Sequence, residues 1–390
     1  MISVNEALDQ LFALVAPLSI ETVPLVQAYG RTLAQDVSAV RDQPPFAASA
    51  MDGYAVAAVD VAPGARFTVI GEAAAGHAFA GSVAKGEAAR IFTGAPLPEG
   101  TDRVIIQEDV IRDGNHFTIS DTLDEGYHVR PAGADFMAGA PLAAPRVLSP
   151  SDIALLAAMN IAQVPVTRRP VVALIATGDE LVQPGETPGP DQIIASNSYG
   201  LAALMDGIGA ETRMLPIARD RHDSLALSFE LAQGADLIVT IGGASVGDYD
   251  LVGTATEAQG MDRAFYKVAM RPGKPLLAGR IGKAAMIGLP GNPVSAMVCG
   301  HIFLVPVLRR MLGLGDAAAP RRTAVLSHPL AANGPREHYM RAILDGDQVT
   351  VCARQDSSLL SVLVEANALV VRPVDDGPRQ SGEQVSIITL

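Results

Sequence analysis

The side chains best suited to chemistry are carboxylates that follow three apolar runs, each long enough for one buried strand. The loops behind these runs, which are residues 171–176, 212–217 and 237–241, contain Asp179 and Glu180, Asp220, and Asp248 and Asp250. Because neighbouring strands of an α/β sheet end at one edge, we expect these carboxylates to lie close together. Clustered carboxylates destabilise one another unless a cation relieves them, and Mg²⁺ prefers oxygen ligands. The pattern predicts a magnesium site, with separate solvated turn residues as the alternative.

The stretch 236–250, DLIVTIGGASVGDYD, combines a strand, a glycine loop and the start of a helix expected over 251–259. Glycines let backbone N–H groups approach an anion, and the helix turns its positive end toward it. Carboxylates repel a bare phosphate, so the acidic residues here indicate an anion held through a divalent cation. A tight turn with Asp as helix cap is the alternative. The candidate ligand-binding residues of this loop are Gly242, Gly243, Ser245, Gly247 and Asp248.

The densest positive cluster of the chain is the turn 267–275, which contains Lys267, Arg271 and Lys274. Arginine offers a planar fork to a phosphate or another oxyanion, and lysine offers a point charge. The cluster is therefore the best candidate for an anion site. A solvated basic turn is the alternative.

A further loop, 288–295, leads into a long helix expected over 294–312. Proline suits the first helical turn, and glycine gives a ligand access to the backbone at the helix N-terminus. Ordinary helix-start chemistry is the alternative. The candidate residues are Pro290, Gly291, Asn292 and Pro293.

Composition narrows the classes of partner. The chain has 29 Lys and Arg against 42 Asp and Glu, a net charge of −13, so its long-range field repels nucleic acid and anionic membranes. Hydrophobic residues make up 49% and charged residues 18%, which is typical of a globular protein. The sequence contains no long uncharged apolar run, so we expect no membrane span. The two cysteines, Cys299 and Cys352, lack the spacing of a metal site, which fits a reducing compartment.

The pattern of strands and helices that must position these loops predicts an α/β multidomain protein. Strands alternate with helices from residue 169, which indicates a doubly wound, mostly parallel sheet with helices on both faces. Short β-prone pieces separated by Gly and Pro indicate an inserted β domain before it and a small C-terminal β domain after it. Helices over 4–14 and 149–160 are expected to pack together as a helical or mixed domain. The predicted domains are 1–40 plus 143–168, 41–142, 169–316 and 317–390.

Seven short strings, taken together, resemble one protein family. They occur in the order and at the intervals of the MoeA family, the molybdopterin molybdenumtransferases, and the resemblance covers nearly the whole chain. The strings are SAMDGYA (49–55), IFTGAPLPEG (91–100), RPAGAD (130–135), TGDEL (177–181), GGASVGDYD (242–250), RPGKP (271–275) and LPGNPVS (289–295).

The resemblance implies a central sheet similar to that of MogA and MoaB proteins. It also implies a cytoplasmic homodimer, with its active cleft between the α/β domain of one subunit and the β domains of the other. The implied reaction inserts molybdate into adenylylated molybdopterin, with Mg²⁺ present and AMP released. A transient contact with the molybdopterin adenylyltransferase is implied as well.

Residue roles carry over by position. Judged by their residue types alone, the motifs of the inserted domain are ordinary turns. Their functional roles therefore rest on the resemblance. It implies metal and substrate carboxylates at Glu180, Asp220 and Asp250, and contributions from the inserted domain by Asp52, Thr93, Arg130 and Asp135. It implies an anion site of Lys267, Arg271 and Lys274, a shaped loop of Pro290 and Pro293, and looser matches at Arg341, Ser357 and Ser361.

Two other functions compete with the transferase. A pterin carrier or scaffold would use the same crevice without chemistry, although a pure anion binder would do better without the carboxylates. A CinA-like, magnesium-dependent nucleotide pyrophosphatase would have a similar α/β domain but would not need the two β domains. Arg271 departs from the lysine expected in many members of the family, which keeps the charge and changes the geometry. The sequence does not separate molybdate from tungstate.

Overall fold

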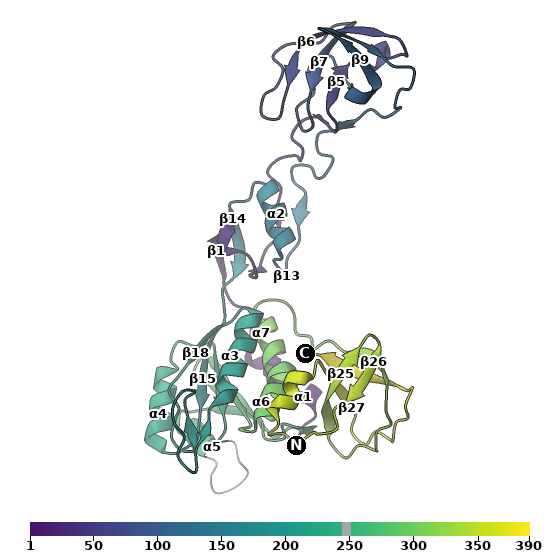
Figure 1. The fold of residues 1–390 in the computed structure, drawn as a ribbon. Coiled ribbons are helices and arrows are strands. Elements are labelled where there is room, and N and C mark those ends of the chain that lie inside the picture. Colours follow the sequence, from purple (N-terminus) through teal and green to yellow (C-terminus); the bar gives the residue numbers. More distant parts are fainter. Residues whose placement is uncertain (244–250) are drawn as a thin grey trace. The chain divides into compact units, whose positions relative to one another are not determined.

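The computed structural model describes residues 1–243 and 251–390, and the chain divides into two compact units. One unit consists of Met1–Glu21, Gly30–Ala34 and Val166–Leu390. The other consists of Thr22–Tyr29 and Gln35–Pro165. The chain passes between the units within β1 (Ile20–Pro24) and β14 (Gln163–Thr167), which Figure 1 labels, and also at residues 29–30 and 34–35.

The first unit contains the predicted doubly wound sheet. Its six strands lie in the order β18-β15-β19-β23-β22-β20. The first four are parallel, whereas β22 runs antiparallel to β23 and β20 runs antiparallel to β22. The bounds are β18 (Glu211–Met214), β15 (Val171–Ala176), β19 (Leu237–Ile241), β23 (Ala284–Leu289), β22 (Leu277–Ile281) and β20 (Asp262–Tyr266).

Helices cover both faces of this sheet, because successive side chains of a strand point to opposite faces. Val172 and Leu174 of β15 belong to one apolar core, and Ala173 and Ile175 belong to the other. Figure 1 shows α3 and α6 on one side of β15, with α4 and α5 on the other. The helices are α1 (Val4–Leu14), α3 (Ser196–Ile208), α4 (His222–Leu231), α5 (Leu251–Ala258), α6 (Pro293–Cys299) and α7 (Val305–Met311).

A π-helical segment, η4 (Gly300–Leu304), joins α6 to α7 and completes the long predicted helix. Among the described residues, Pro293–Met311 is the one helix long and apolar enough to cross a membrane by length and composition alone. Of its most apolar window, 72% is buried within the protein, as in the core helix of a globular domain.

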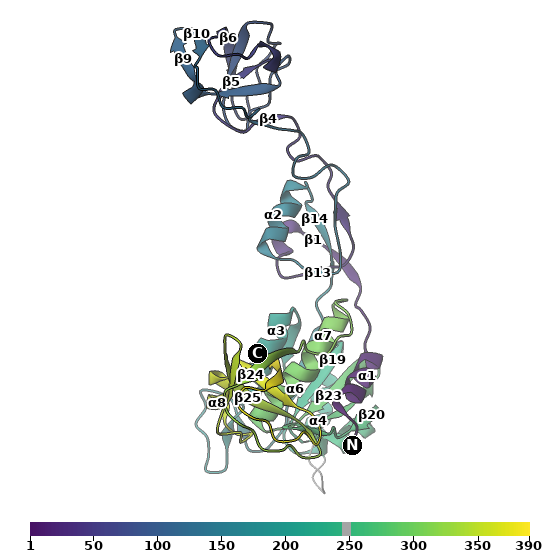
Figure 2. The ribbon, with the colours of Figure 1, turned by 90° about the vertical axis from the view of Figure 1, so that its right-hand side faces the viewer.

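The expectation that the first helix packs on helix 149–160 is wrong. Figure 2 shows α1 beside β20, it also contacts β22 and α7, and its apolar face (Leu8, Leu11) is buried in the core of the α/β sheet. The second helix, α2 (Pro150–Ala158), lies in the other unit and contacts η1 (Leu25–Gln27). Both helices begin with a capping box, at Ser3 and at Ser149, so local chemistry sets their starts and tertiary packing sets their partners.

The second unit contains a six-stranded sheet in the order β8-β5-β7-β6-β10-β9. In its core Phe117 stacks on Phe67, with ring centroids 5.2 Å apart, and contacts the tilted ring of Tyr54 at 4.4 Å. The strands are β5 (Gly53–Val56), β6 (Arg66–Ala73), β7 (Glu87–Ile91), β8 (Arg103–Ile106), β9 (Val110–Asp113) and β10 (His116–Ile119). Short elements complete the chain up to residue 167: β2 (Thr32–Leu33), β3 (Val37–Ser38), β4 (Ala48–Ser49), β11 (Val129–Arg130), β12 (Pro141–Leu142), β13 (Arg146–Val147), η2 (Ala58–Asp60) and η3 (Gln107–Asp109).

The C-terminal region forms a third six-stranded sheet, in the order β21-β25-β26-β24-β28-β27, with a further pairing of β25 and β27. One strand, β21 (Met270–Arg271), comes from the basic turn and pairs with β25, so that Arg271 lies beside His338. The other elements are β24 (Arg322–Leu326), β25 (Glu337–Asp345), β26 (Gln348–Val351), α8 (Leu360–Glu365), β27 (Ala368–Arg372) and β28 (Gln384–Thr389). The division into four domains with the boundaries given above stays a prediction.

Candidate functional site

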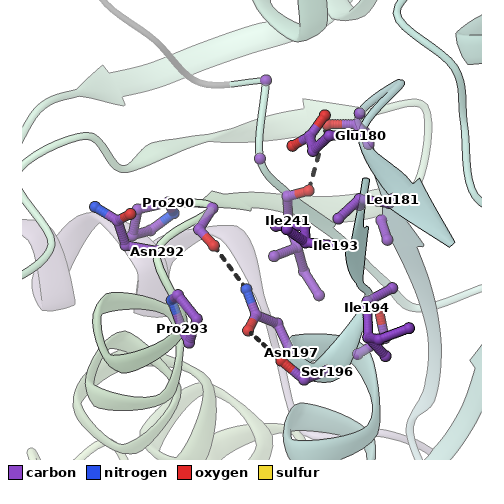
Figure 3. A pocket seen from close by; sticks show the side chains of 18 of the residues that line it. Glu180, Leu181, Ile193, Ile194, Ser196, Asn197, Ile241, Pro290, Asn292 and Pro293 are labelled. Atoms are coloured by element: carbon purple, nitrogen blue, oxygen red, sulfur yellow. Dashed lines mark hydrogen bonds between the residues drawn. The ribbon is translucent and has the colours of Figure 1, made fainter. Parts of the chain in front are cut away.

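A cavity of about 690 Å³ opens at the carboxyl ends of β15, β19 and β23 (Figure 3). Glu180 and Asp220 both line it, as do the glycines that follow β19 and the loop that enters α6. The structure therefore brings together predicted residues from four separate loops. Those that line the cavity are Glu180, Asp220, Gly242, Gly243, Pro290, Gly291, Asn292 and Pro293.

Backbone hydrogen bonds hold these loops together beyond the ends of the strands. The amide of Thr177 donates to Ile241 O at 2.9 Å, and the amide of Gly242 donates to Leu289 O at 3.0 Å. Gly242 and Gly243 have φ of 91° and 64°, a region that side chains other than glycine rarely adopt. The glycines are required here for backbone conformation as well as for access to the cavity.

The two acidic side chains of the cavity have no hydrogen-bond donor or ion-pair partner among the described residues. Two such oxygen donors suit Mg²⁺, which keeps several waters and needs few protein ligands. Within residues 1–243 and 251–390 no group of three or more His, Cys, Asp or Glu forms a metal site. Asp250, the third predicted ligand, lies outside the described residues, together with Ser245, Gly247 and Asp248.

The wall opposite Glu180 contains residues that the sequence did not single out. Asn197, in the first turn of α3, donates from Nδ2 to Gly291 O at 2.7 Å, and Ser196 Oγ donates to Asn197 Oδ1 at 3.4 Å (Figure 3). Ser198 also lines the cavity. The polar run Ser-Asn-Ser at the start of a helix in an α/β sheet was a signal that could have indicated them.

The loop between β26 and α8 contributes Ser358 to the cavity lining, next to the predicted Ser357. The amide of Val294 donates to Ser357 O at 3.0 Å, which attaches this loop to the start of α6. Arg341 is 1% exposed, and its guanidinium donates to Asp356 O at 2.9 Å and Leu359 O at 3.1 Å. In this structure Arg341 therefore holds the loop rather than facing the cavity.

The predicted anion site lies next to the cavity but does not line it. Pro275 of the basic turn is a lining residue, whereas Lys267, Arg271 and Lys274 are not. Lys267 Nζ lies 5.0 Å from the ring centroid of Tyr266. Burial and the nearby Arg271 lower the pKa of His338 to about 4, so this histidine is neutral at pH 7 and adds no charge to the turn.

Comparison with known proteins accounts for the whole chain. Three family models match it: MoeA N-terminal region (domain I and II) over residues 2–160, probable molybdopterin binding domain over 173–310, and MoeA C-terminal region (domain IV) over 323–390. A molybdopterin molybdenumtransferase of Nostoc sp. is 37% identical, with 100% of this chain and 94% of that protein aligned. Molybdopterin molybdenumtransferase 2 of Mycobacterium tuberculosis is also 37% identical, with 95% of each aligned.

The chain belongs to the MoeA family. A crystal structure of a molybdopterin biosynthesis MoeA protein from Pyrococcus horikosii has the same fold, with a TM-score of 0.86 and 32% identity over 100% of this chain and 99% of that one. The resemblance seen in the seven strings is thereby confirmed, and so is the expected fold class of a MoeA protein.

The remaining predicted residues lie in the second unit, within the part that matches the MoeA N-terminal region. Asp52 Oδ1 accepts hydrogen bonds from the amide and the hydroxyl of Thr93, both at 2.8 Å. These bonds stabilise the charged carboxylate and so lower the pKa of Asp52. Arg130 and Asp135 are exposed. Asp52 and Thr93 thus form a pair, and the roles of all four stay predictions.

Proposed function

We propose that this chain is a molybdopterin molybdenumtransferase, which inserts molybdate into adenylylated molybdopterin with release of AMP. The observation that carries the proposal is identity of 31–37% to proteins of this name, over 95–100% of the chain. The full-length match favours this function over a CinA-like pyrophosphatase, because both β regions match MoeA models.

The cavity supports this chemistry through its own residues. Ser196, Asn197 and Ser358 offer hydrogen-bonding groups to a polar substrate, and exposed Ile193 and Ile194 offer an apolar wall to a heteroaromatic ring. Lys267, Arg271 and Lys274, in the adjoining turn, attract oxyanions toward an otherwise acidic chain. Molybdate and the phosphates are therefore recruited locally while the net charge stays negative.

Glu180 and Asp220, with Asp250, are the residues we propose to hold Mg²⁺. The bound metal would offset the charge of the phosphates and polarise the phosphoanhydride. The carboxylates would fix the position of the cation, and without a cation they would repel an anionic substrate. This is also the reason for preferring an enzyme to a pure carrier.

The family further suggests a homodimer whose cleft combines the α/β domain of one subunit with the β domains of the other. Two observations agree with that proposal: the cavity lies in one unit of the chain, and the Asp52–Thr93 pair lies in the other. A cytoplasmic location and a transient contact with the adenylyltransferase belong to the same proposal.

The test measures AMP released from adenylylated molybdopterin by the purified protein with Mg²⁺, with and without molybdate. We expect molybdate-dependent release and a product that reactivates a molybdenum-free apoenzyme. Asp220→Ala should bind the adenylate and release no AMP, whereas Asp223→Ala, which removes an exposed carboxylate paired with Arg221, should behave as wild type. Tight binding by the wild type without AMP release under molybdate or tungstate would establish a carrier instead.

A further inference from the structure

We infer that Arg219 and Asp179 are positioning residues for the reaction, because they set the positions of Glu180 and Asp220. Each of the two holds the loop of the other through hydrogen bonds, and we call this pair of contacts the clasp. The inference rests on the proposed function for its catalytic consequence. The clasp itself is a structural feature of the two loops that follow β15 and β18.

One half of the clasp is a cation that three carbonyl groups surround. Arg219 Nη1 donates to Asp179 O at 3.0 Å, to Leu181 O at 3.1 Å and more weakly to Gly178 O at 3.4 Å. The remaining carbonyl of the turn, Glu180 O, accepts from the amide of Ile193 at 2.7 Å. Every carbonyl from residue 178 to 181 is therefore engaged, which fixes the backbone that carries the Glu180 side chain.

The other half runs in the opposite direction. Asp179 Oδ1 accepts from the amide of Asp220 at 3.2 Å, so the loop after β15 also holds the loop after β18. The amide of Gly178 donates to Ala218 O at 3.0 Å and closes the gap between them. Neither Arg219 nor Asp179 lines the cavity, whereas the residues between and beside them, Glu180 and Asp220, do.

The chemistry explains why an arginine is suited to this place. A guanidinium stays charged and is never an acceptor, and here the two N–H groups of Nη1 are shared among three converging carbonyls. A neutral side chain would leave the carbonyls without this donor, and the loop would relax.

The test compares Arg219→Leu with Arg221→Leu, a matched loss of charge at an exposed arginine that pairs with Asp223 at 3.3 Å. Three quantities are measured: AMP release, Mn²⁺ binding to the protein by electron paramagnetic resonance, and amide hydrogen exchange of residues 177–182 and of Asp220. We expect Arg219→Leu to lower kcat and to weaken Mn²⁺ binding, each by about 10- to 100-fold, with little change in KM. Exchange in the loop should become faster, and Arg219→Lys should restore part of each loss.

The outcomes separate the clasp from the proposed function. If Arg219→Leu matches Arg221→Leu in exchange and in Mn²⁺ binding, the clasp is wrong, whatever the activity. If the wild type itself releases no AMP, the proposed function fails, and hydrogen exchange still decides the clasp. If Arg219→Leu does not fold, Asp179→Ala decides, since it removes only the acceptor for Asp220 N and should speed exchange at that amide.

Discussion

Replacement of Gly242 should test most directly whether the close approach of the loops after β15 and β19 forms the cavity. Gly242 has φ of 91°, and a Cβ added there would lie 2.8 Å from Thr177 O and 3.1 Å from Thr177 Oγ1. Because Thr177 O is a backbone atom directly after β15, the clash cannot be relieved by rotating a side chain. Gly242→Ala must push apart the loops that follow β15 and β19.

Two costs add up. The left-handed conformation costs an alanine about 1–2 kcal/mol, and overpacking at a tight contact costs about 1–3 kcal/mol. The sum is about 2–5 kcal/mol, which for a unit of this size lowers Tm by about 4–20 °C. AMP release should fall as well, because the shifted loop carries Glu180.

The assay is thermal unfolding followed by circular dichroism, with AMP release measured at 25 °C. Gly207→Ala is the matched control, because Gly207 lies near the end of α3 with nothing within 4 Å of its added Cβ. Alanine favours a helix by about 0.5–1 kcal/mol over glycine, so this control should raise Tm slightly. A Tm for Gly242→Ala within 1 °C of the wild type, with full activity, would refute the reasoning.

Two further predictions concern the C-terminal sheet. His338 has a folded pKa of about 4 against an ordinary 6.5, so the unfolded chain binds more protons between these values and stability falls as the pH drops from 6.5 to 4. His338→Gln should lose that part of the pH dependence, about 2–3 kcal/mol across the range, and parallel unfolding curves for both proteins would contradict it. Gln355 bonds to both the amide and the carbonyl of Arg341, at 3.0 and 2.9 Å, so Gln355→Leu should release the loop that carries Ser358 and raise KM for the adenylate. Gln380→Leu, at an exposed position, should leave KM unchanged, and equal KM values for the two variants would sink the idea.

Local patterns were sufficient for the α/β scaffold. The runs VVALIA and LIVTI are apolar throughout and bounded by turn residues, and they form β15 and β19 within one residue of their predicted ends. The helices predicted over 4–14 and 149–160 form α1 and α2, and capping boxes at Ser3 and Ser149 start them. Since parallel strands end at one edge, the sequence also predicted that Glu180 and Asp220 would share a cavity.

The tertiary structure alone decided which distant segments meet there. Asn197 contacts Gly291 across 94 residues, the basic turn contributes β21 to the C-terminal sheet, and α1 packs on the sheet rather than on α2. It also placed Ser358 on the cavity wall and Lys267, Arg271 and Lys274 outside its lining. Periodicity records which face of an element is apolar, but the partner of that face depends on shape and register between segments far apart in the chain. That is why the sequence alone predicted the strand ends and their carboxylates, whereas the complete wall of the cavity required the folded chain.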